Sequence, residues 1–461
     1  MTAQTTTVPV LETLQASFSG AMLRPGDDGY DTARQVHNGL IDKRPALIAR
    51  CLNTADVVDA VNFGRREGME ISVRGGGHNV AGKAVTDGGL MIDLAPMQGV
   101  HVDPRARTVR AQGGVTWHQF NRAAAVHGLA TTGGMVSTTG VAGLTLGGGF
   151  GWLMGRYGLA VDNLASAEVV MAAGEVLTAG PDESPDLFWA LRGGGGNFGV
   201  VTSFEFRAHP LSEVVGGMVT HPIAAAADAV GFYHGLTRAA PDELVAVCAM
   251  GQSPDGSGDT VVTLGFCHCG DPSAAKEDVA PLFSFATPRD QVLETMPYPV
   301  VNTLSDAAYP TGALNYWKSA FLTDLSDGAT QAMVEAMELC PSGMGGIIIE
   351  HLHGAATRVE PTATAFPHRD PGYSVLVIAQ WADSAATAAN IAWARDTFEA
   401  LGPFTAPRRY VNYLSADDAG FVADAYGPNY ERLAAAKQAY DPQNLFRLNQ
   451  NIRPAGPHSL R

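Results

Sequence analysis

A histidine that directly follows three consecutive glycines is the part of this sequence best suited to chemistry. Gly75, Gly76 and Gly77 precede His78 in the segment 73–82. Glycine has no Cβ, so such a backbone can lie directly against a flat or charged ligand. The imidazole of His78 would then stand beside that ligand as a nucleophile. Further glycine-rich segments follow at 133–151 and 193–199, and the three segments together predict a large, elongated cofactor.

Two patterns known from nucleotide-binding proteins are nearly present. Gly77–Lys83 fits G-x-x-x-x-G-K, but Ala84 stands where a Ser or Thr must hold Mg²⁺. The segment 194–199 fits G-x-G-x-x-G, yet a helix is expected before it at 185–191 and a strand after it at 200–206. A dinucleotide fingerprint needs the opposite order. The sequence therefore disfavours an NTPase and excludes a Rossmann domain.

The composition predicts a globular chain of more than one domain. With 461 residues, 46% of them hydrophobic and 16% charged, the chain is too long for one simple core and too apolar for a disordered protein. Its formal net charge of -16 argues against nucleic acid as a partner, because phosphate contacts need clustered Lys and Arg.

Neither export nor membrane insertion is expected. Residues 1–7 lack the layout of a signal peptide. The segment 131–155 has no charged residue, but Gly, Thr and Ser interrupt it too often for a spanning helix. An odd number of irregularly spaced cysteines predicts free thiols in a reducing compartment, hence the cytoplasm. The segment 267–269 (Cys-His-Cys) lacks the second ligand pair of a zinc site, so we expect a strand end and no metal.

Short strands between glycine-rich loops predict an α+β fold. Thr54 is the expected N-cap of the first of the predicted helices. Strands are expected at 46–51, 70–74, 90–94, 100–103, 108–111, 168–172, 175–178, 200–206, 259–264 and 374–379, and helices at 55–67, 116–127, 185–191, 224–240, 274–283 and 385–401.

The texture of the sequence changes near Pro210, where alanine-rich helical stretches begin. We therefore expect a first, cofactor-binding domain at 1–212 and a second, substrate domain at 213–405. The last segment, 406–461, has a different character again and is expected to return to the first domain.

An ordered set of motifs resembles a known family. Arg74–His78, Gly147–Gly151, Tyr157–Asn163 and Gly196–Thr202 resemble the PCMH-type FAD-binding domain of the vanillyl-alcohol oxidase superfamily. The tail Tyr440–Ile452 resembles the C-terminal signature of the berberine-bridge-enzyme-like group. One glycine motif is a weak signal, whereas this ordered set is specific. The resemblance implies a two-domain α+β fold, with a PCMH-type FAD-binding domain and a central antiparallel-sheet substrate domain.

The resemblance also implies that FAD is the cofactor and that His78 is joined covalently to its 8α-methyl carbon. A neutral imidazole is a competent nucleophile toward the quinone methide that oxidised flavin can form. Many relatives add a cysteine thioether at the position of Val136, which cannot form that bond, so we expect a single attachment. Backbone N–H groups of the glycine segments are expected to receive diphosphate oxygens. The residues that the resemblance places at the cofactor are His78, Arg74, Gly75, Gly76, Gly77, Asn79, Gly82, Thr138, Gly140, Gly143, Gly147, Gly148, Gly151, Trp152, Gly199, Val201, Tyr410, Asn449 and Asn451.

Tyr410 and Glu350 are rival candidates for the general base, and the sequence leaves the choice open. Tyr410 lies in the segment 410–413, which resembles the family's Y-x-N motif, and it would need a nearby positive charge or the flavin environment to lower its pKa. Glu350 alternates with apolar residues in the strand-like segment 346–351, so it faces either a cleft or solvent. Thr139 has nearly the shape of the Val that accompanies oxidase behaviour in plant relatives, and we expect it to leave O₂ a route to the flavin. The expected substrate-pocket residues are Tyr309, Tyr316, His351, His353 and Asn412.

The resemblance implies an FAD-linked oxidoreductase, and we expect an oxidase. A hydride would pass from a carbinol or amine C–H of a small natural-product-like substrate to flavin N5, and O₂ would reoxidise the flavin to give H₂O₂. Two alternatives stay open: a flavin-dependent oxygenase that acts on a polyketide-like substrate through a flavin–oxygen adduct, and a flavin-holding protein without turnover. The expected partners are the small molecule and O₂, with no nucleic acid and no membrane. A homodimer is one option for the assembly.

Overall fold

Four β-sheets organise the part of the chain that the structure, a computed structural model, describes: residues 17–253, 255 and 257–456. Their strand orders are β1-β2-β4-β3, β5-β6-β10-β8-β9, β11-β7 and β15-β12-β14-β13-β17-β18-β16-β19. The strands are β1 (Ala21–Leu23), β2 (Leu47–Arg50), β3 (Ile71–Arg74), β4 (Leu90–Asp93), β5 (Val100–Asp103), β6 (Thr108–Gln112), β7 (Leu129–Ala130), β8 (Leu164–Val170), β9 (Val176–Ala179), β10 (Val200–Arg207), β11 (His209–Pro210), β12 (Glu213–Pro222), β13 (Leu244–Gln252), β14 (Thr260–His268), β15 (Asp290–Pro297), β16 (Leu314–Leu322), β17 (Gly346–Leu352), β18 (Gly372–Trp381) and β19 (Thr405–Ala406). The α-helices are α2 (Tyr30–Ala33), α3 (Thr54–Arg66), α4 (Trp117–Ala125), α5 (Val141–Leu146), α6 (Met154–Tyr157), α7 (Ala160–Asn163), α8 (Pro185–Leu191), α9 (Ala226–Ala239), α10 (Pro272–Ser284), α11 (Tyr298–Val301), α12 (Asp327–Glu338), α13 (Thr387–Leu401), α14 (Val422–Tyr426) and α15 (Tyr430–Tyr440).

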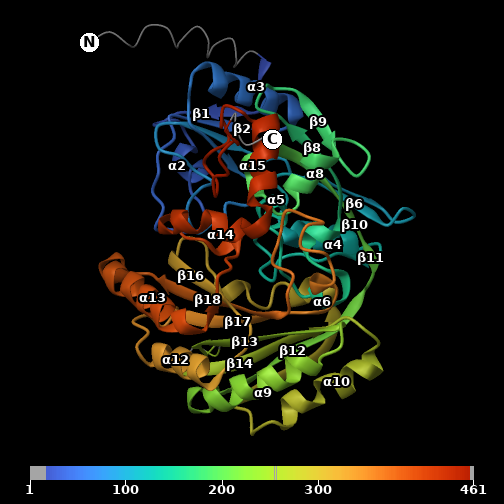
Figure 1. The fold of residues 1–461 in the computed structure, drawn as a ribbon, viewed down its shortest axis with the longest axis vertical. Coiled ribbons are helices and arrows are strands. Elements are labelled where there is room, and N and C mark those ends of the chain that lie inside the picture. The colour runs from blue at the N-terminus through green and yellow to red at the C-terminus, as the bar shows by residue number, and fades with distance from the viewer. Residues whose placement is uncertain (1–16, 254, 256, 457–461) are drawn as a thin grey trace.

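The eight-stranded sheet is antiparallel throughout and forms the lower half of the molecule in Figure 1. Helices α9, α10, α12 and α13 cover its face away from the glycine-rich half. Successive side chains of a strand point to opposite faces. In β17, Ile347 and Ile349 therefore pack in the core with these helices, while Ile348 and Glu350 face the other way. That second face is the one available to a ligand.

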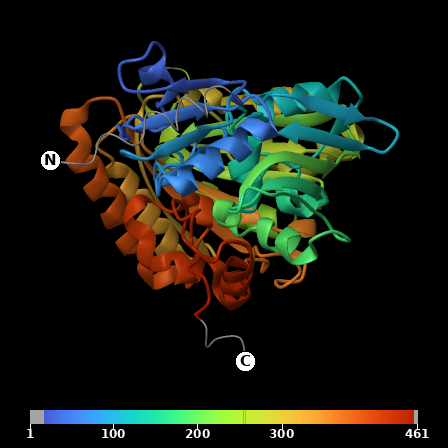
Figure 2. The same cartoon turned by 90° about the horizontal axis from the view of Figure 1, so that it is seen from above.

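The C-terminal segment packs on the N-terminal half of the chain. Helix α15 contacts α8, and the red C-terminal helices lie against these green elements in both views (Figure 1, Figure 2). Leu433 and Ile452 join the core of the five-stranded sheet, and Phe446 joins that of the four-stranded sheet. The buried ammonium of Lys437 donates to the carbonyl of Asn197 at 2.6 Å and pairs with Asp441 at 2.7 Å. The tail is therefore fixed beside the glycine-rich loops.

A buried ion pair joins the two halves. Arg369, in the connection between β17 and β18, donates to both carboxylate oxygens of Asp162 in α7, each at 2.8 Å. The Arg369 side chain is 1% exposed, and the same guanidinium also donates to Thr364 Oγ1 at 2.8 Å. This fork-to-fork geometry fixes the direction of the connection as well as its distance.

The expected strands and helices are present, with ends that differ by a few residues, and the α+β class is confirmed. The strand expected to end at the Cys-His-Cys segment is β14, which ends at His268. The N-cap prediction was wrong by one residue: the Asn53 side chain accepts from the Asp56 N–H at 3.0 Å, while the Thr54 hydroxyl donates to Glu168 at 2.7 Å. An amide oxygen at Asn53 reaches that N–H, so Thr54 is free to bind β8.

All strands of the large sheet lie between Glu213 and Ala406. On this basis we propose the division 1–212, 213–405 and 406–461, whose outermost residues, 1–16 and 457–461, lie outside the described residues. The segment 1–7, in which no signal peptide is expected, lies outside them too. Of the helices within the described ranges, none has both the length and the apolar character needed to cross a bilayer.

Candidate active site

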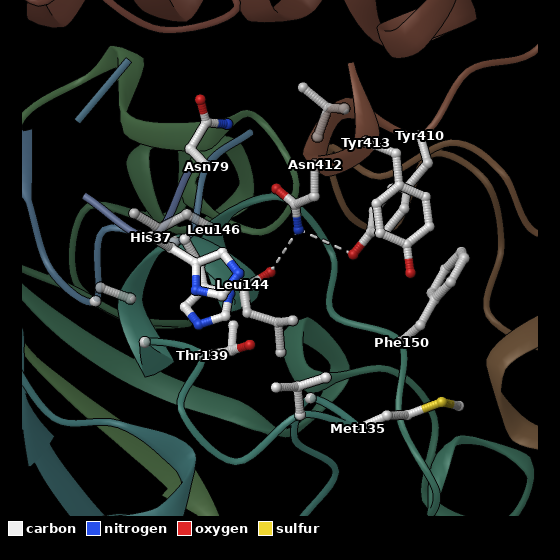
Figure 3. Close-up of a pocket in the computed structure, with 18 of the residues that line it drawn as sticks. His37, Asn79, Met135, Thr139, Leu144, Leu146, Phe150, Tyr410, Asn412 and Tyr413 are labelled. Atoms are coloured by element: carbon white, nitrogen blue, oxygen red, sulfur yellow. Dashed lines mark hydrogen bonds between the residues drawn. The ribbon is translucent and has the colours of Figure 1, made fainter. Parts of the chain in front are cut away.

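A cavity of about 420 Å³ separates the glycine-rich loops from the open face of the large sheet. This volume lies within the range of small-molecule sites. Figure 3 shows side chains of the glycine-rich half and of the C-terminal segment around it. Its lining includes, from the loops and the tail, His37, Gly75–Asn79, Lys83, Met135, Val136, Thr139, Gly140, Gly143, Leu144, Phe150, Trp152, Gly195, Gly196, Gly199, Val201, Tyr410–Tyr413, Leu448 and Asn449, and from the sheet side Gly217, Val247, Thr263, Gly265, Tyr309, Trp317, Ile348, Glu350 and Ile378.

Two glycine loops touch at the cofactor end of this cavity. A Cβ on Gly76 would lie 2.4 Å from the backbone nitrogen of Gly140, so neither position has room for a side chain. Gly77 has a φ of +71°, which also favours glycine. A Cβ on Gly143, in contrast, would meet nothing within 4 Å. The loops thus present bare backbone along an elongated space, which fits the flat ring and the diphosphate of FAD.

His78 stands at the edge of this cradle as a neutral imidazole. Its Nε2 is 2.9 Å from the hydroxyl oxygen of Thr138, and its ring stacks on that of His37. Burial, with a smaller contribution from His37, lowers the pKa of His78 to about 3. Because only the unprotonated ring has a lone pair to donate, the site keeps His78 nucleophilic at neutral pH.

The predicted cofactor residues divide into two groups. Those that line the cavity are Gly75, Gly76, Gly77, His78, Asn79, Gly140, Gly143, Trp152, Gly199, Val201, Tyr410 and Asn449. Those that the described lining does not include are Arg74, Gly82, Thr138, Gly147, Gly148, Gly151 and Asn451. Thr138 reaches the site through His78, and the others lie behind the wall.

Close packing explains the positions behind the wall. Arg74 makes a two-bond ion pair with the buried Asp93, at 2.9 and 2.8 Å, and so ties β3 to β4. A Cβ on Gly147 would lie 2.0 Å from Asn412 Oδ1, and one on Gly151 would lie 1.8 Å from the carbonyl oxygen of Gly133. These residues shape the cradle, and direct contact between them and the cofactor stays a prediction.

Gly148, Gly82 and Asn451 complete the second group. A Cβ on Gly148 would lie 2.8 Å from the ring of Phe366, and one on Gly82 would lie 2.7 Å from Ile41. The side-chain oxygen of Asn451 is buried and accepts no hydrogen bond from any described residue. Close packing therefore accounts for Gly148 and Gly82, and contact of Asn451 with the cofactor stays a prediction.

Glu350 faces the cavity from β17 and is 4% exposed. Both of its carboxylate oxygens accept from the hydroxyl of Tyr413, each at 3.1 Å. Burial raises the pKa of Glu350 to about 7, against the lowering effect of hydrogen bonds from Tyr413 and Ser374. A carboxyl group with this pKa can exchange a proton at neutral pH.

Tyr410 is held in a different way. Its hydroxyl oxygen accepts from the Gly149 N–H at 2.8 Å and from Asn412 Nδ2 at 2.9 Å, and its ring stacks on Phe150 with centroids 4.2 Å apart. Asn412 also donates to the Leu144 carbonyl (Figure 3). Burial raises the pKa of Tyr410. The positive charge that would make Tyr410 a base at neutral pH is not found among the described lining residues near it.

Three expected substrate residues do not line the cavity. Tyr316 precedes Trp317, which does, so Tyr316 points to the opposite face of β16, where it donates to Asp417 at 2.7 Å. His351 shares the helix-covered face of β17 and lies 4.9 Å, centroid to centroid, from both His353 and Tyr373. His353 packs beside Gly155. Strand alternation thus turns Tyr316 and His351 away from the cavity, and His353 follows the end of β17, while Tyr309 and Asn412 do line the cavity.

Thr139 and Val136 both line the cavity, as expected. Cys51, Cys248, Cys267, Cys269 and Cys340 are all free thiols, and none of them belongs to the described lining. No cysteine thiol therefore lines the cavity among the described residues.

Several lining residues were missed by sequence reasoning. Tyr413 stood inside the quoted segment 410–413, and Phe150 inside a glycine motif, but neither carried a signal of its own. His37 and Trp317 come from segments without a family motif in this sequence, and Lys83 was considered only as part of an NTPase pattern. For Trp317, a correct assignment of the inward face of β16 would have been enough.

Comparisons with known proteins agree with this site. The family model described as an FAD binding domain matches residues 45–180, and the model described as berberine and berberine-like matches residues 409–453. (R)-6-hydroxynicotine oxidase of Paenarthrobacter nicotinovorans is 33% identical over 459 residues, covering 95% of this chain and 98% of that protein. The chain belongs to the berberine-bridge-enzyme-like family of FAD-linked oxidoreductases.

Solved structures support the same assignment for this FAD-linked oxidoreductase. 6-Hydroxy-D-nicotine oxidase from Arthrobacter nicotinovorans superposes with a TM-score of 0.88 at 33% identity, over 95% of this chain and 99% of the other. The berberine-bridge-enzyme-like protein 1 of Physcomitrella patens gives 0.88 at 25% identity, over 97% and 99%. The expected family, the PCMH-type fold and FAD as the cofactor are confirmed.

Proposed function

We propose that this FAD-linked oxidoreductase is an oxidase of small, largely apolar molecules, taking a hydride from a carbon that carries an amine or a hydroxyl group. Glu350 carries the proposal. It is the only carboxylate among the described residues that line the cavity. It is buried, and its pKa of about 7 suits a group that must gain and lose a proton at neutral pH.

Glu350 is the better candidate for the base. The Tyr410 hydroxyl oxygen already accepts two hydrogen bonds, and burial holds the Tyr410 proton in place. The Glu350 carboxylate accepts hydrogen bonds from the hydroxyl of Tyr413, which touches both oxygens equally, and from Ser374. Its remaining lone pairs are available for a substrate amine or alcohol. Tyr410 then serves to hold Asn412 and the Gly149 turn.

The walls near Glu350 indicate the substrate class. Phe150, Trp152, Tyr309, Trp317 and Tyr413 contribute aromatic surface to the cavity. Aromatic rings attract planar molecules and, when a cation approaches their faces, ammonium groups. A protonated amine could give its proton to Glu350 and become the neutral form that is oxidised. One relative is named as an oxidase of 6-hydroxynicotine, which supports an oxidase reaction here.

FAD, when bound, supplies the two-electron acceptor that takes the hydride and passes the electrons to O₂, giving H₂O₂. We assign His78 as its only covalent attachment, because the ring is neutral and no cysteine lies in the described lining. Thr139, small and inside the cavity, leaves space for O₂. Trp152, Asn449 and the glycine backbone hold the cofactor.

The test is an anaerobic screen of small amines and secondary alcohols for loss of the flavin absorbance of the purified holoprotein. A hit is then mixed with O₂, and H₂O₂ is counted against substrate consumed. One H₂O₂ per substrate supports the oxidase. Substrate oxygenation without H₂O₂, or reduction that O₂ does not reverse, would overturn it. Glu350→Gln serves as the control for direct reduction of the flavin by the compound.

A further inference from the structure

Lys83 is the only Lys or Arg among the described residues that line the cavity. It lies on the glycine-rich side, in the loop that leads from Gly77 toward β4, whereas the single carboxylate, Glu350, lies on the sheet side. The cavity therefore has one cation at the cofactor end. The rest of that end is glycine backbone, apolar side chains and neutral polar groups.

The turn around Gly82 places Lys83 against the cradle. The Gly82 N–H donates to the Asn79 carbonyl at 3.0 Å, and the Lys83 N–H donates to Asn79 Oδ1 at 3.2 Å. Gly82 has a φ of +66°, which allows the chain to turn back there. Asn79 itself lines the cavity next to His78. The G-x-x-x-x-G-K pattern is thus a turn followed by β4, and no helix follows it as in an NTPase loop.

The ammonium group of Lys83 makes no hydrogen bond and no ion pair with any described residue. Its neighbour Lys43, in contrast, donates to the carbonyls of Gly82 and Val85, at 2.9 and 3.2 Å. Burial, and then repulsion from Lys43, lowers the pKa of Lys83, with a smaller raising effect from Glu70. Glu70 is itself engaged by Thr86 and Arg447. A half-buried cation without a partner is costly unless an anion joins it.

We infer that Lys83 pairs with the diphosphate of FAD and thereby makes the site select flavins that carry phosphate. The diphosphate is a dianion at neutral pH, and it must enter a cavity with apolar walls. Backbone N–H groups provide partial positive charge, but among the described lining residues only Lys83 carries a full positive charge. This inference rests on FAD as the cofactor and is independent of the proposed oxidase reaction.

The experiment uses full-length His78→Ala protein freed of flavin, so that binding is reversible. Affinities for FAD and riboflavin are measured by fluorescence at low and high salt, about 20 mM and about 500 mM, across which charge screening strengthens several-fold. Lys83→Met should weaken FAD about tenfold at low salt, because a charge-assisted contact is lost. It should leave riboflavin affinity unchanged, and the FAD deficit should shrink at high salt. Lys83→Arg should bind FAD within about threefold of the parent.

Lys276→Met is the matched control, since it removes the same charge from the exposed face of α10. Equal FAD affinity in Lys83→Met and Lys276→Met would overturn the inference, and so would an equal loss for FAD and riboflavin. Melting of the flavin-free protein shows whether Lys83→Met folds. If it does not, the inference is tested on the His78→Ala protein alone, whose FAD affinity must fall with salt more steeply than its riboflavin affinity. Mass spectrometry of the wild-type chain shows separately whether His78 is the attachment point. If it is not, flavin-stripped wild-type protein replaces His78→Ala as the starting protein.

Discussion

The imidazole rings of His37 and His78 lie stacked, with centroids 3.9 Å apart and planes inclined by 17°. Two charged rings at this distance would repel each other, so the contact favours two neutral ones. Burial lowers the pKa of both residues. The backbone N–H of His37 donates to the Gly77 carbonyl at 3.0 Å, which fixes the stack to the glycine cradle. The nucleophile is therefore poised before the cofactor is attached.

The rate of covalent attachment should not depend on pH between about pH 5 and about pH 8. His78, with a pKa near 3, is fully unprotonated across this window, so no titration of the nucleophile limits the rate. The measurement is acid-stable flavin formed with time after FAD is added to flavin-free protein. A rate that falls about tenfold per pH unit below about pH 7 would show an ordinary histidine pKa and contradict the stacked, neutral pair.

His78→Ala should release the flavin when the purified protein is denatured in acid, while the wild-type chain stays yellow. The reason is that His78 is the proposed point of attachment and no cysteine belongs to the described lining. The mass of the wild-type chain should exceed the sequence mass by one flavin. His118→Ala, on the exposed side of α4, is the control and should keep its flavin. Flavin retained by His78→Ala would mean that the attachment lies elsewhere.

Glu350→Gln should lower kcat about 10²- to 10⁴-fold, the usual contribution of a general base. In the wild-type enzyme the carboxylate form is active, so kcat/KM should rise as pH passes through about 7, the pKa of Glu350. The variant should lose this inflection, since an amide does not titrate there. The comparison is a pair of pH profiles with one substrate. An inflection that survives in Glu350→Gln would assign it to another group.

The same carboxyl should make the folded protein less stable at higher pH. A group whose pKa rises from 4.5 to about 7 on folding favours the folded state below the lower value, and this benefit is lost as pH rises through the upper one. The loss is at most about 3 kcal/mol. Denaturant unfolding at about pH 5 and about pH 8 should show a smaller decline for Glu350→Gln than for wild type. Glu338→Gln, exposed on α12, should decline like wild type.

Tyr413→Phe should move the kcat/KM inflection to higher pH. The Tyr413 hydroxyl donates to both oxygens of Glu350 and lowers its pKa, so removing the hydroxyl leaves the burial effect less opposed. Tyr410→Phe is the matched control: it should cost stability, because Gly149 N–H and Asn412 lose their acceptor, but should leave the inflection in place. The reverse pattern would make Tyr410 the base.

Local motifs predicted the cradle well because its chemistry is local. A run of glycines before His78 needs no tertiary information to suggest bare backbone beside a nucleophile, and the close contact of Gly76 with Gly140 agrees with it. The motif could not show that Arg74 turns away to Asp93, since that ion pair depends on the register of β3 against β4.

The sheet side was harder to predict, for a physical reason. β17 carries isoleucine on both faces, so its alternation does not say which face meets helices and which meets a ligand. The packing of α9, α12 and α13 decides this, and it turns Glu350 inward and His351 outward. For the same reason, the sequence predicted Tyr316 as a pocket residue in β16, whereas its neighbour Trp317 lines the cavity. Glu350 and Tyr413 are 63 positions apart in the chain, and neither segment contains a sequence pattern that predicts their contact.

The two-sided use of β17 restricts how this enzyme can evolve. Replacing Ile348 alters the cavity and leaves the packing of the helices on the other face unchanged, so new specificities can arise by single substitutions. Insertion or deletion of one residue upstream in the strand would instead move every later side chain to the opposite face. His351 would then face the cavity, and the Glu350 carboxylate would be buried in the apolar core under the helices. Relatives that diverge in substrate are therefore expected to keep the length of this strand while its inward residues change.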